Sequence, residues 1–153
     1  MAFDLFDIKE EVDFDVIVLH STFPDYKLVY WLNQFLKIQF IRWEHDLDLF
    51  VQNKLVCFAS YQYIDEEGQK ELNLLKNNTL NSVMENTKNS LFKNKIKEEK
   101  VFLIPELSKF DYILKSYGYK PEKLIEKIKK IPNIQIIKQI EISNIKSISH
   151  LIF

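Results

Sequence analysis

The chain has 153 residues, of which 46% are apolar and 14% are aromatic, and its formal net charge is −1. This composition is typical of a globular protein and excludes an intrinsically disordered one, so we expect a single domain over residues 1–153. Only two glycines occur, which excludes a phosphate-binding loop and a dinucleotide fingerprint, because each needs several glycines at fixed spacing.

The first fifty residues predict a strand, a helix and a second strand. Asp13–His20 alternates and then runs apolar, as a strand entering a core does. Apolar residues at helical spacing predict a helix over Asp25–Lys37, and Ile38–Trp43 is interpreted as the next strand. The acidic start and the short apolar runs predict neither a signal peptide nor a membrane span, so we expect a cytoplasmic protein without membrane partners.

Glu44 to Asp48 combine three carboxylates with His45. Such a group could bind a divalent cation, but hard cations draw more ligands from a defined loop pattern, and that pattern does not occur here. We therefore interpret the segment as a solvated loop and expect no metal site.

The middle of the chain predicts a hairpin followed by a long irregular segment. Lys54–Ile64 is interpreted as a strand, Asp65–Gly68 as a turn and Gln69–Lys76 as the returning strand. Cys57 lies inside the first of these strands, which predicts a small core residue; as the single cysteine it excludes an internal disulfide. Residues 77–100 are rich in asparagine and lysine, which predicts a flexible loop or an insert.

A strand over Val101–Ile104 is predicted to stop at Pro105, because proline cannot donate a hydrogen bond to a neighbouring strand. Glu106 to Lys109 are interpreted as a connecting turn, and Phe110–Tyr117 as the next strand.

Glu106 and Asp111 sit at the two ends of this turn. Short acidic side chains at such positions accept hydrogen bonds from turn amides or pair with a nearby lysine. The alternative is that Glu106, Asp111 and Tyr112 together form a small polar site. The residues alone leave both interpretations open.

The last part of the chain predicts a helix that begins at Pro121 and a closing strand over Ile134–Ile142. A shift of 96 residues lays this strand-helix-strand unit over the first one, so that Phe14-Asp15 falls on Phe110-Asp111. Two such units predict an α+β, ferredoxin-like sandwich with an inserted β-hairpin. Its sheet would be largely antiparallel, with the helices on one face and the other face open.

Ile104-Pro105-Glu106, three further residues and then Phe110-Asp111-Tyr112 resemble the signature of the IPExxxVDY family, small bacterial proteins typical of Bacteroidetes. Phe110 stands where the family has valine. The resemblance extends over most of the chain, including the opening Phe14-Asp15 strand. The family has no established activity, so the resemblance implies a bacterial protein of unknown function.

These observations favour a non-catalytic interaction or regulatory module without a cofactor, because no catalytic arrangement is recognisable around the histidines. An open sheet face would be covered by a second copy or by an unidentified protein partner. The candidate contact residues are those of the motif (Ile104, Pro105, Glu106, Asp111 and Tyr112) and three tyrosines of the predicted sheet (Tyr61, Tyr63 and Tyr117).

Two other functions remain open from the sequence. Residues 51–153 carry a net charge of +5, so RNA binding or a role as an accessory in RNA processing is one alternative. Twenty of the 21 basic residues are lysines, and base recognition in DNA relies on arginine, so we expect no DNA partner. The other alternative is a small-ligand sensor that uses the turn Tyr117–Pro121 or His20–Asp25.

Overall fold

The computed structural model of the chain describes residues 12–51, 53–85 and 95–153. In this part of the chain, six strands form one antiparallel sheet in the order β10-β1-β9-β6-β5-β2. The helices α2 (Asp25–Leu36) and α3 (Pro121–Ile128) pack on one face of it. The predicted α+β class is therefore confirmed. The strands of the sheet are β1 (Asp15–Ser21), β2 (Ile41–Arg42), β5 (Ser60–Ile64), β6 (Glu71–Lys76), β9 (Tyr112–Tyr117) and β10 (Ile134–Ile140).

The strand β1 and the helix α2 lie close to their predicted positions. The helix begins after Pro24 and ends at Lys37, which has a positive φ of 56°. The predicted strand over Ile38–Trp43 is wrong for most of its length, because only Ile41–Arg42 pair with β5. The N–H of Phe40 donates to the side chain of Asn33 and has no strand partner.

The two strand-helix-strand units of the sequence end differently in the structure. β10, which follows α3, pairs with β1. β2, which follows α2, lies at the opposite edge of the sheet and is separated from β1 by three strands. The last strand therefore occupies a different place in the two units.

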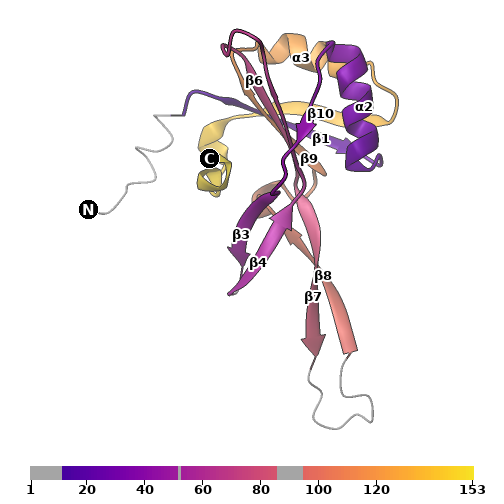
Figure 1. The fold of residues 1–153 in the computed structure, drawn as a ribbon, viewed down its shortest axis with the longest axis vertical. Helices are drawn as coiled ribbons and strands as arrows, with labels where there is room; N and C mark the ends of the chain where they lie inside the picture. The colour runs from indigo at the N-terminus through magenta and orange to yellow at the C-terminus, as the bar shows by residue number, and fades with distance from the viewer. Residues whose placement is uncertain (1–11, 52, 86–94) are drawn as a thin grey trace, which may run out of the picture.

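Two hairpins project from the body of the molecule (Figure 1). The predicted strand 54–64 is interrupted at Ala59, where β4 (Lys54–Phe58) leaves the sheet and pairs with β3 (Leu47–Val51). In the same way, β6 continues past Asn77 into β7 (Asn78–Glu85), which pairs with β8 (Lys95–Phe102). Part of the segment 77–100, for which a flexible loop or an insert is expected, is thus a hairpin; residues 86–94 lie outside the described residues.

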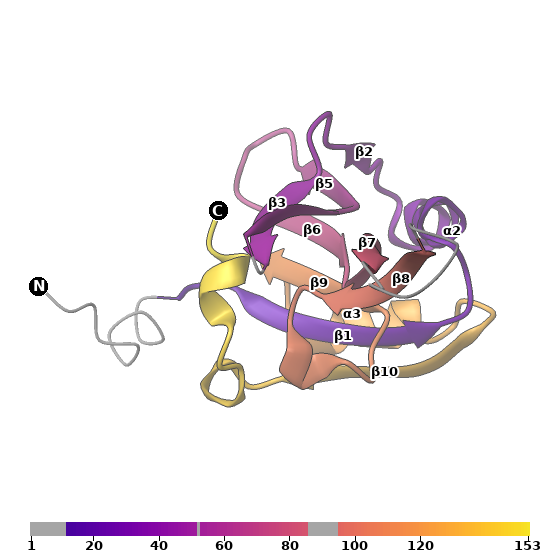
Figure 2. The ribbon, with the colours of Figure 1, turned by 90° about the horizontal axis from the view of Figure 1, so that it is seen from below.

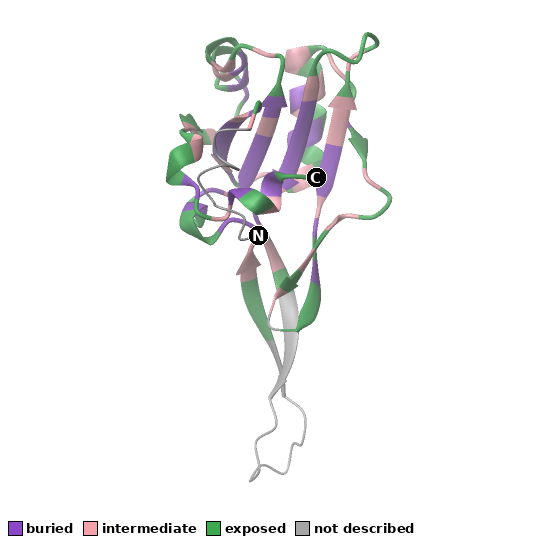
Figure 3. Cartoon of the chain, turned by 90° about the vertical axis from the view of Figure 1, so that its left-hand side faces the viewer, coloured by how far each residue is buried: buried purple, intermediate pink, exposed green. Residues whose placement is uncertain are grey.

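Two buried clusters lie on the two faces of the sheet, because successive residues of a strand point to opposite sides. Ile17 and Leu19 face the helices, whereas Val16 and Val18 face the other way. That second face is not fully open: the loop 103–110 and the 3-10 helices η2 (Ile142–Asn144) and η3 (Ile148–Leu151) cover part of it. In Figure 3 the strands of the body are largely buried and the projecting hairpins are more exposed.

Candidate functional site

The loop that carries the motif, residues 103–111, folds around the buried side chain of Asn77. The amide nitrogen of Asn77 donates to the carbonyl oxygens of Leu107 (2.9 Å) and Phe110 (3.1 Å). Its amide oxygen accepts from the N–H of Ile104 (2.8 Å), and its backbone bonds the same loop at two further points. One residue thus satisfies five backbone polar groups of the loop. Sequence reasoning missed this role, because an asparagine at a strand end signals only a turn.

Glu106 fastens this loop to the C-terminal 3-10 helices. Its carboxylate accepts hydrogen bonds from the backbone N–H of Ser147 (2.5 Å) and from the hydroxyl of Ser147 (3.1 Å). Burial raises the pKa of Glu106, but these hydrogen bonds, one from its own backbone N–H and the nearby His150 together lower it by more. The pKa of Glu106 therefore lies below its ordinary value.

Acid is expected to weaken the contact between Glu106 and Ser147. A carboxylate with a depressed folded-state pKa contributes stability that is present above the unfolded-state value of 4.5 and is lost as pH falls through the folded-state pKa. A Glu106→Gln variant cannot ionise, so its urea midpoint should fall less than that of the wild type between about pH 5 and pH 3. Glu126→Gln, at an exposed position of α3, is the matched control. Identical pH slopes for wild type and Glu106→Gln would contradict the expectation.

Asp111 and Tyr112 fasten the end of β1. A carboxylate oxygen of Asp111 accepts from the backbone N–H of Ser21 (3.0 Å) and lies 2.5 Å from Nδ1 of His20. The buried hydroxyl of Tyr112 donates to the carbonyl of Phe23. Burial and nearby carboxylates raise the pKa of Tyr112, so the hydroxyl remains a protonated donor at neutral pH.

The polar residues of the motif therefore point to separate segments. Glu106 bonds the C-terminal 3-10 helices, whereas Asp111 and Tyr112 bond the residues that end and follow β1. Ile104 is fully buried, and Pro105 begins the short 3-10 helix η1 (Pro105–Leu107). This arrangement holds separate parts of the fold together, with the bonds spread around the loop.

The three tyrosines named from the sequence do not share one face of the sheet. Tyr61 and Tyr63 lie on the helix side, and Tyr61 is only 7% exposed. The hydroxyl of Tyr61 donates to Asp25 (2.9 Å); burial and this bond raise the pKa of Tyr61 to about 12. Tyr117 lies on the other face and is 42% exposed. These residues therefore provide no common stacking platform.

The acidic segment near His45 is part loop and part strand. Asp46 accepts two hydrogen bonds from the guanidinium of Arg42, at 3.0 and 3.3 Å, and β3 begins at Leu47. Among the residues that the structure describes, no group of three or more His, Cys, Asp or Glu side chains is placed to hold a metal ion.

The outer side of the β3–β4 hairpin exposes apolar side chains. Phe50 is 80% exposed, the highest fraction of any large apolar residue in the described ranges, and it lies directly opposite Leu55, which is 53% exposed. We call the surface formed by Phe50, Leu55 and the neighbouring Cys57 the hairpin face. Beside it, a groove of about 560 Å³ runs between β3 and β8, lined by Leu49, Phe50, Val51, Glu99, Lys100, Val101, Phe102, Pro105 and His150. Figure 2 shows the two hairpins next to each other from below.

Cys57 lies on the hairpin face and is exposed, so the predicted core position is wrong. The reason is the alternation of β4, in which Val56 and Phe58 point into the core and the residue between them points outward. A hydrogen bond with Asp48, together with burial and nearby carboxylates, raises the pKa of Cys57. Its thiol is therefore accessible but mostly protonated at neutral pH.

Comparisons of the chain with protein-family models, with curated proteins and with solved structures find no match. The resemblance to the IPExxxVDY family therefore stays a prediction. In the ranges that the structure describes, neither helix is long and apolar enough to cross a membrane.

Proposed function

We propose that this chain is a non-catalytic interaction module of the bacterial cytoplasm, a member of the IPExxxVDY family, and that it binds another protein chain through the hairpin face. The observation that carries this proposal is the exposed pair of Phe50 and Leu55. The polar residues of the motif form hydrogen bonds within the fold, so they are not free to form the contact surface.

The free-energy cost of exposing Phe50 and Leu55 to water favours a protein partner. Fully burying one side chain of this size contributes about 1.5–3 kcal/mol, and an aromatic residue beside a groove is typical of an interface anchor. The charged residues that line the groove, Glu99 and Lys100, have opposite signs. A polyanion such as RNA would be attracted by a surface of one sign, so these charges favour a protein.

We propose that four strands of the sheet and the two helices form a ferredoxin-like core. The strands β10-β1-β9-β6 alternate in direction, and α2 and α3 lie on one face, as that plan requires. In this interpretation β6 takes the place of the second strand, and the segment that follows α2, with the projecting β3–β4 hairpin, is an insertion before it. An inserted hairpin that projects from a complete core is well placed for contact with a partner.

Native mass spectrometry of the wild type and of Phe50→Ser tests the proposal. A multiple of 18.4 kDa that is lost in Phe50→Ser identifies the partner as a second copy of the chain. A monomer that captures a protein from bacterial lysate, with capture lost in Phe50→Ser, identifies a different chain. Ile136→Ser is the matched control, because Ile136 is 49% exposed on β10, away from the hairpins. Association or capture that is unchanged in Phe50→Ser, or absent in the wild type, overturns the proposal.

Cys57 provides a second readout on the same surface. Labelling of its exposed thiol by a thiol reagent should slow when the partner is bound, because Cys57 is next to the Phe50–Leu55 pair. Labelling that proceeds at the same rate in the complex would place the interface elsewhere.

A further inference from the structure

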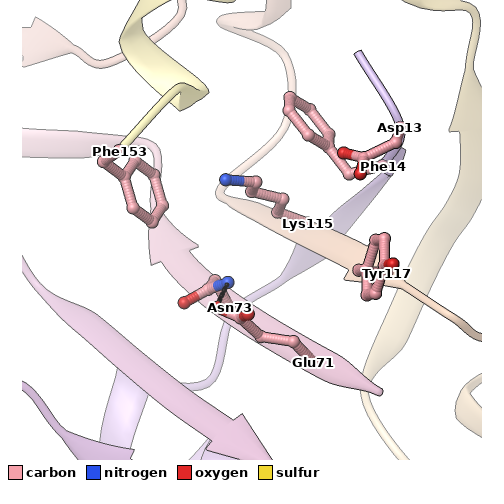
Figure 4. A pocket seen from close by; sticks show the side chains of 7 residues that line it. All are labelled: Asp13, Phe14, Glu71, Asn73, Lys115, Tyr117 and Phe153. Atoms are coloured by element: carbon pink, nitrogen blue, oxygen red, sulfur yellow. Dashed lines mark hydrogen bonds between the residues drawn. The ribbon is translucent and has the colours of Figure 1, made fainter. Parts of the chain in front are cut away.

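The sheet face opposite the helices contains a pocket around Lys115 (Figure 4). Its volume is about 240 Å³, and its lining residues are Asp13, Phe14, Glu71, Asn73, Lys115, Tyr117 and Phe153. Pockets for drug-sized ligands span roughly 300–1,000 Å³, so this one suits a smaller molecule. It is distinct from the hairpin face, and its test does not depend on the proposed function.

Lys115 projects from β9 between two aromatic rings. Its ammonium nitrogen lies 4.5 Å from the ring centre of Phe14 and 4.0 Å from that of Phe153. Burial lowers the pKa of Lys115, and the carboxylates of Glu71 and Asp13 oppose that effect. Within the described ranges, no carboxylate oxygen lies within 4.0 Å of this nitrogen. In this part of the chain, a half-buried cation is thus held by rings and has no ion pair.

The acidic side of the pocket is held by a network of amide side chains. One oxygen of Glu71 accepts hydrogen bonds from Gln62 (2.9 Å) and Asn73 (3.0 Å), and Gln62 also donates to Asn73 (3.2 Å). Asn73 is only 2% exposed, so the network is firmly placed on β5 and β6. The other oxygen of Glu71 accepts no hydrogen bond from the residues that the structure describes. It is therefore available to a donor that enters the pocket.

We propose that this pocket binds a small zwitterion of the α-amino acid type with an apolar side chain. The ligand's carboxylate pairs with the ammonium of Lys115, its ammonium group pairs with the free oxygen of Glu71, and its side chain packs against the rings of Phe14 and Phe153. A simple anion such as phosphate fits poorly, because two carboxylates and one ammonium line the pocket. A simple cation leaves Lys115 without a counter-charge. A zwitterion supplies both missing partners in one molecule.

Isothermal titration of the full chain with three matched probes tests this proposal. L-Leucine carries both charges, 4-methylpentanoate carries only the carboxylate, and isoamylamine carries only the amine. Leucine is expected to bind at least about tenfold more tightly than either analogue, because each analogue lacks one of the two charge-assisted contacts. L-Phenylalanine and inorganic phosphate complete the set, the first expected to bind and the second not.

Two variants connect binding to the named residues. Lys115→Met should abolish binding of leucine, and Glu71→Gln should reduce the preference for leucine over 4-methylpentanoate. Lys120→Met, an exposed lysine outside this pocket, is the control and should bind like the wild type. Circular dichroism confirms that each variant is folded. The proposal is overturned if neither amino acid binds, if an analogue or phosphate binds as tightly as leucine, or if Lys115→Met retains binding.

Discussion

Replacing Asn77 by leucine is expected to lower the free energy of unfolding by about 3–5 kcal/mol. Leucine has nearly the same shape, but it leaves the N–H of Ile104 and the carbonyls of Leu107 and Phe110 without their bonds to this side chain. Unsatisfied buried polar groups cost about 1–3 kcal/mol each, and part of that cost is recovered when the loop relaxes. Urea unfolding monitored by tryptophan fluorescence measures the change.

Gln34→Leu is the matched control for this substitution. Gln34 is exposed on α2, so replacing its amide side chain by leucine should shift stability by less than about 0.5 kcal/mol. Asn77→Asp separates the contributions further: it keeps the acceptor for Ile104 but places a carboxylate oxygen where an amide donated to two carbonyls. It should therefore also be strongly destabilising. A wild-type midpoint for Asn77→Leu would show that the loop does not depend on this residue.

Gly118→Ala is expected to destabilise the protein by about 2–4 kcal/mol. Gly118 has a φ of +79°, and a β-carbon added to it would lie 2.5 Å from the carbonyl oxygen of Gln69. That contact is with backbone, so it is relieved only by moving the turn between β5 and β6 away from the end of β9. Differential scanning calorimetry would record the effect as a lower Tm.

Gly68→Ala provides the comparison, because Gly68 has a similar φ of +67° but nothing within 4 Å of an added β-carbon. It should show only the conformational cost, about 1 kcal/mol. The difference between the two variants therefore isolates the steric contact at Gly118. Equal losses would mean that the backbone conformation alone accounts for both.

Local sequence patterns predict the elements that keep the same packing partners along their whole length. The helix expected over Asp25–Lys37 is observed as Asp25–Leu36, and the turn at Asp65–Gly68 joins β5 to β6 as expected. The strand 54–64 was predicted as one element, because its alternation gives no sign that the chain leaves the sheet at Ala59. Cys57 was misplaced for the same reason, since the pattern could not identify which side of β4 is buried.

The contacts that hold the motif could not be predicted, because they join residues far apart in the sequence. Glu106 bonds Ser147, 41 positions away, and Asp111 lies beside His20, 91 positions away. Periodicity indicates that a residue has a buried side, but not which distant segment covers it. The pattern does not indicate the Lys115 pocket for the same reason, since its walls come from the two residues before β1, from β6 and β9, and from Phe153.

The position of β1 in the sheet has a consequence for how the protein is made. β1 is the first strand of the described chain, yet its neighbours are β9 and β10, and about 90 residues separate its end from the start of β9. At roughly 5–20 residues per second, a ribosome needs roughly 5–18 s to synthesise that interval. For that time Val16 to Leu19, fully buried in the finished fold, have no strand partner. Until β9 and β10 are made, the nascent chain therefore exposes this apolar segment, which favours aggregation.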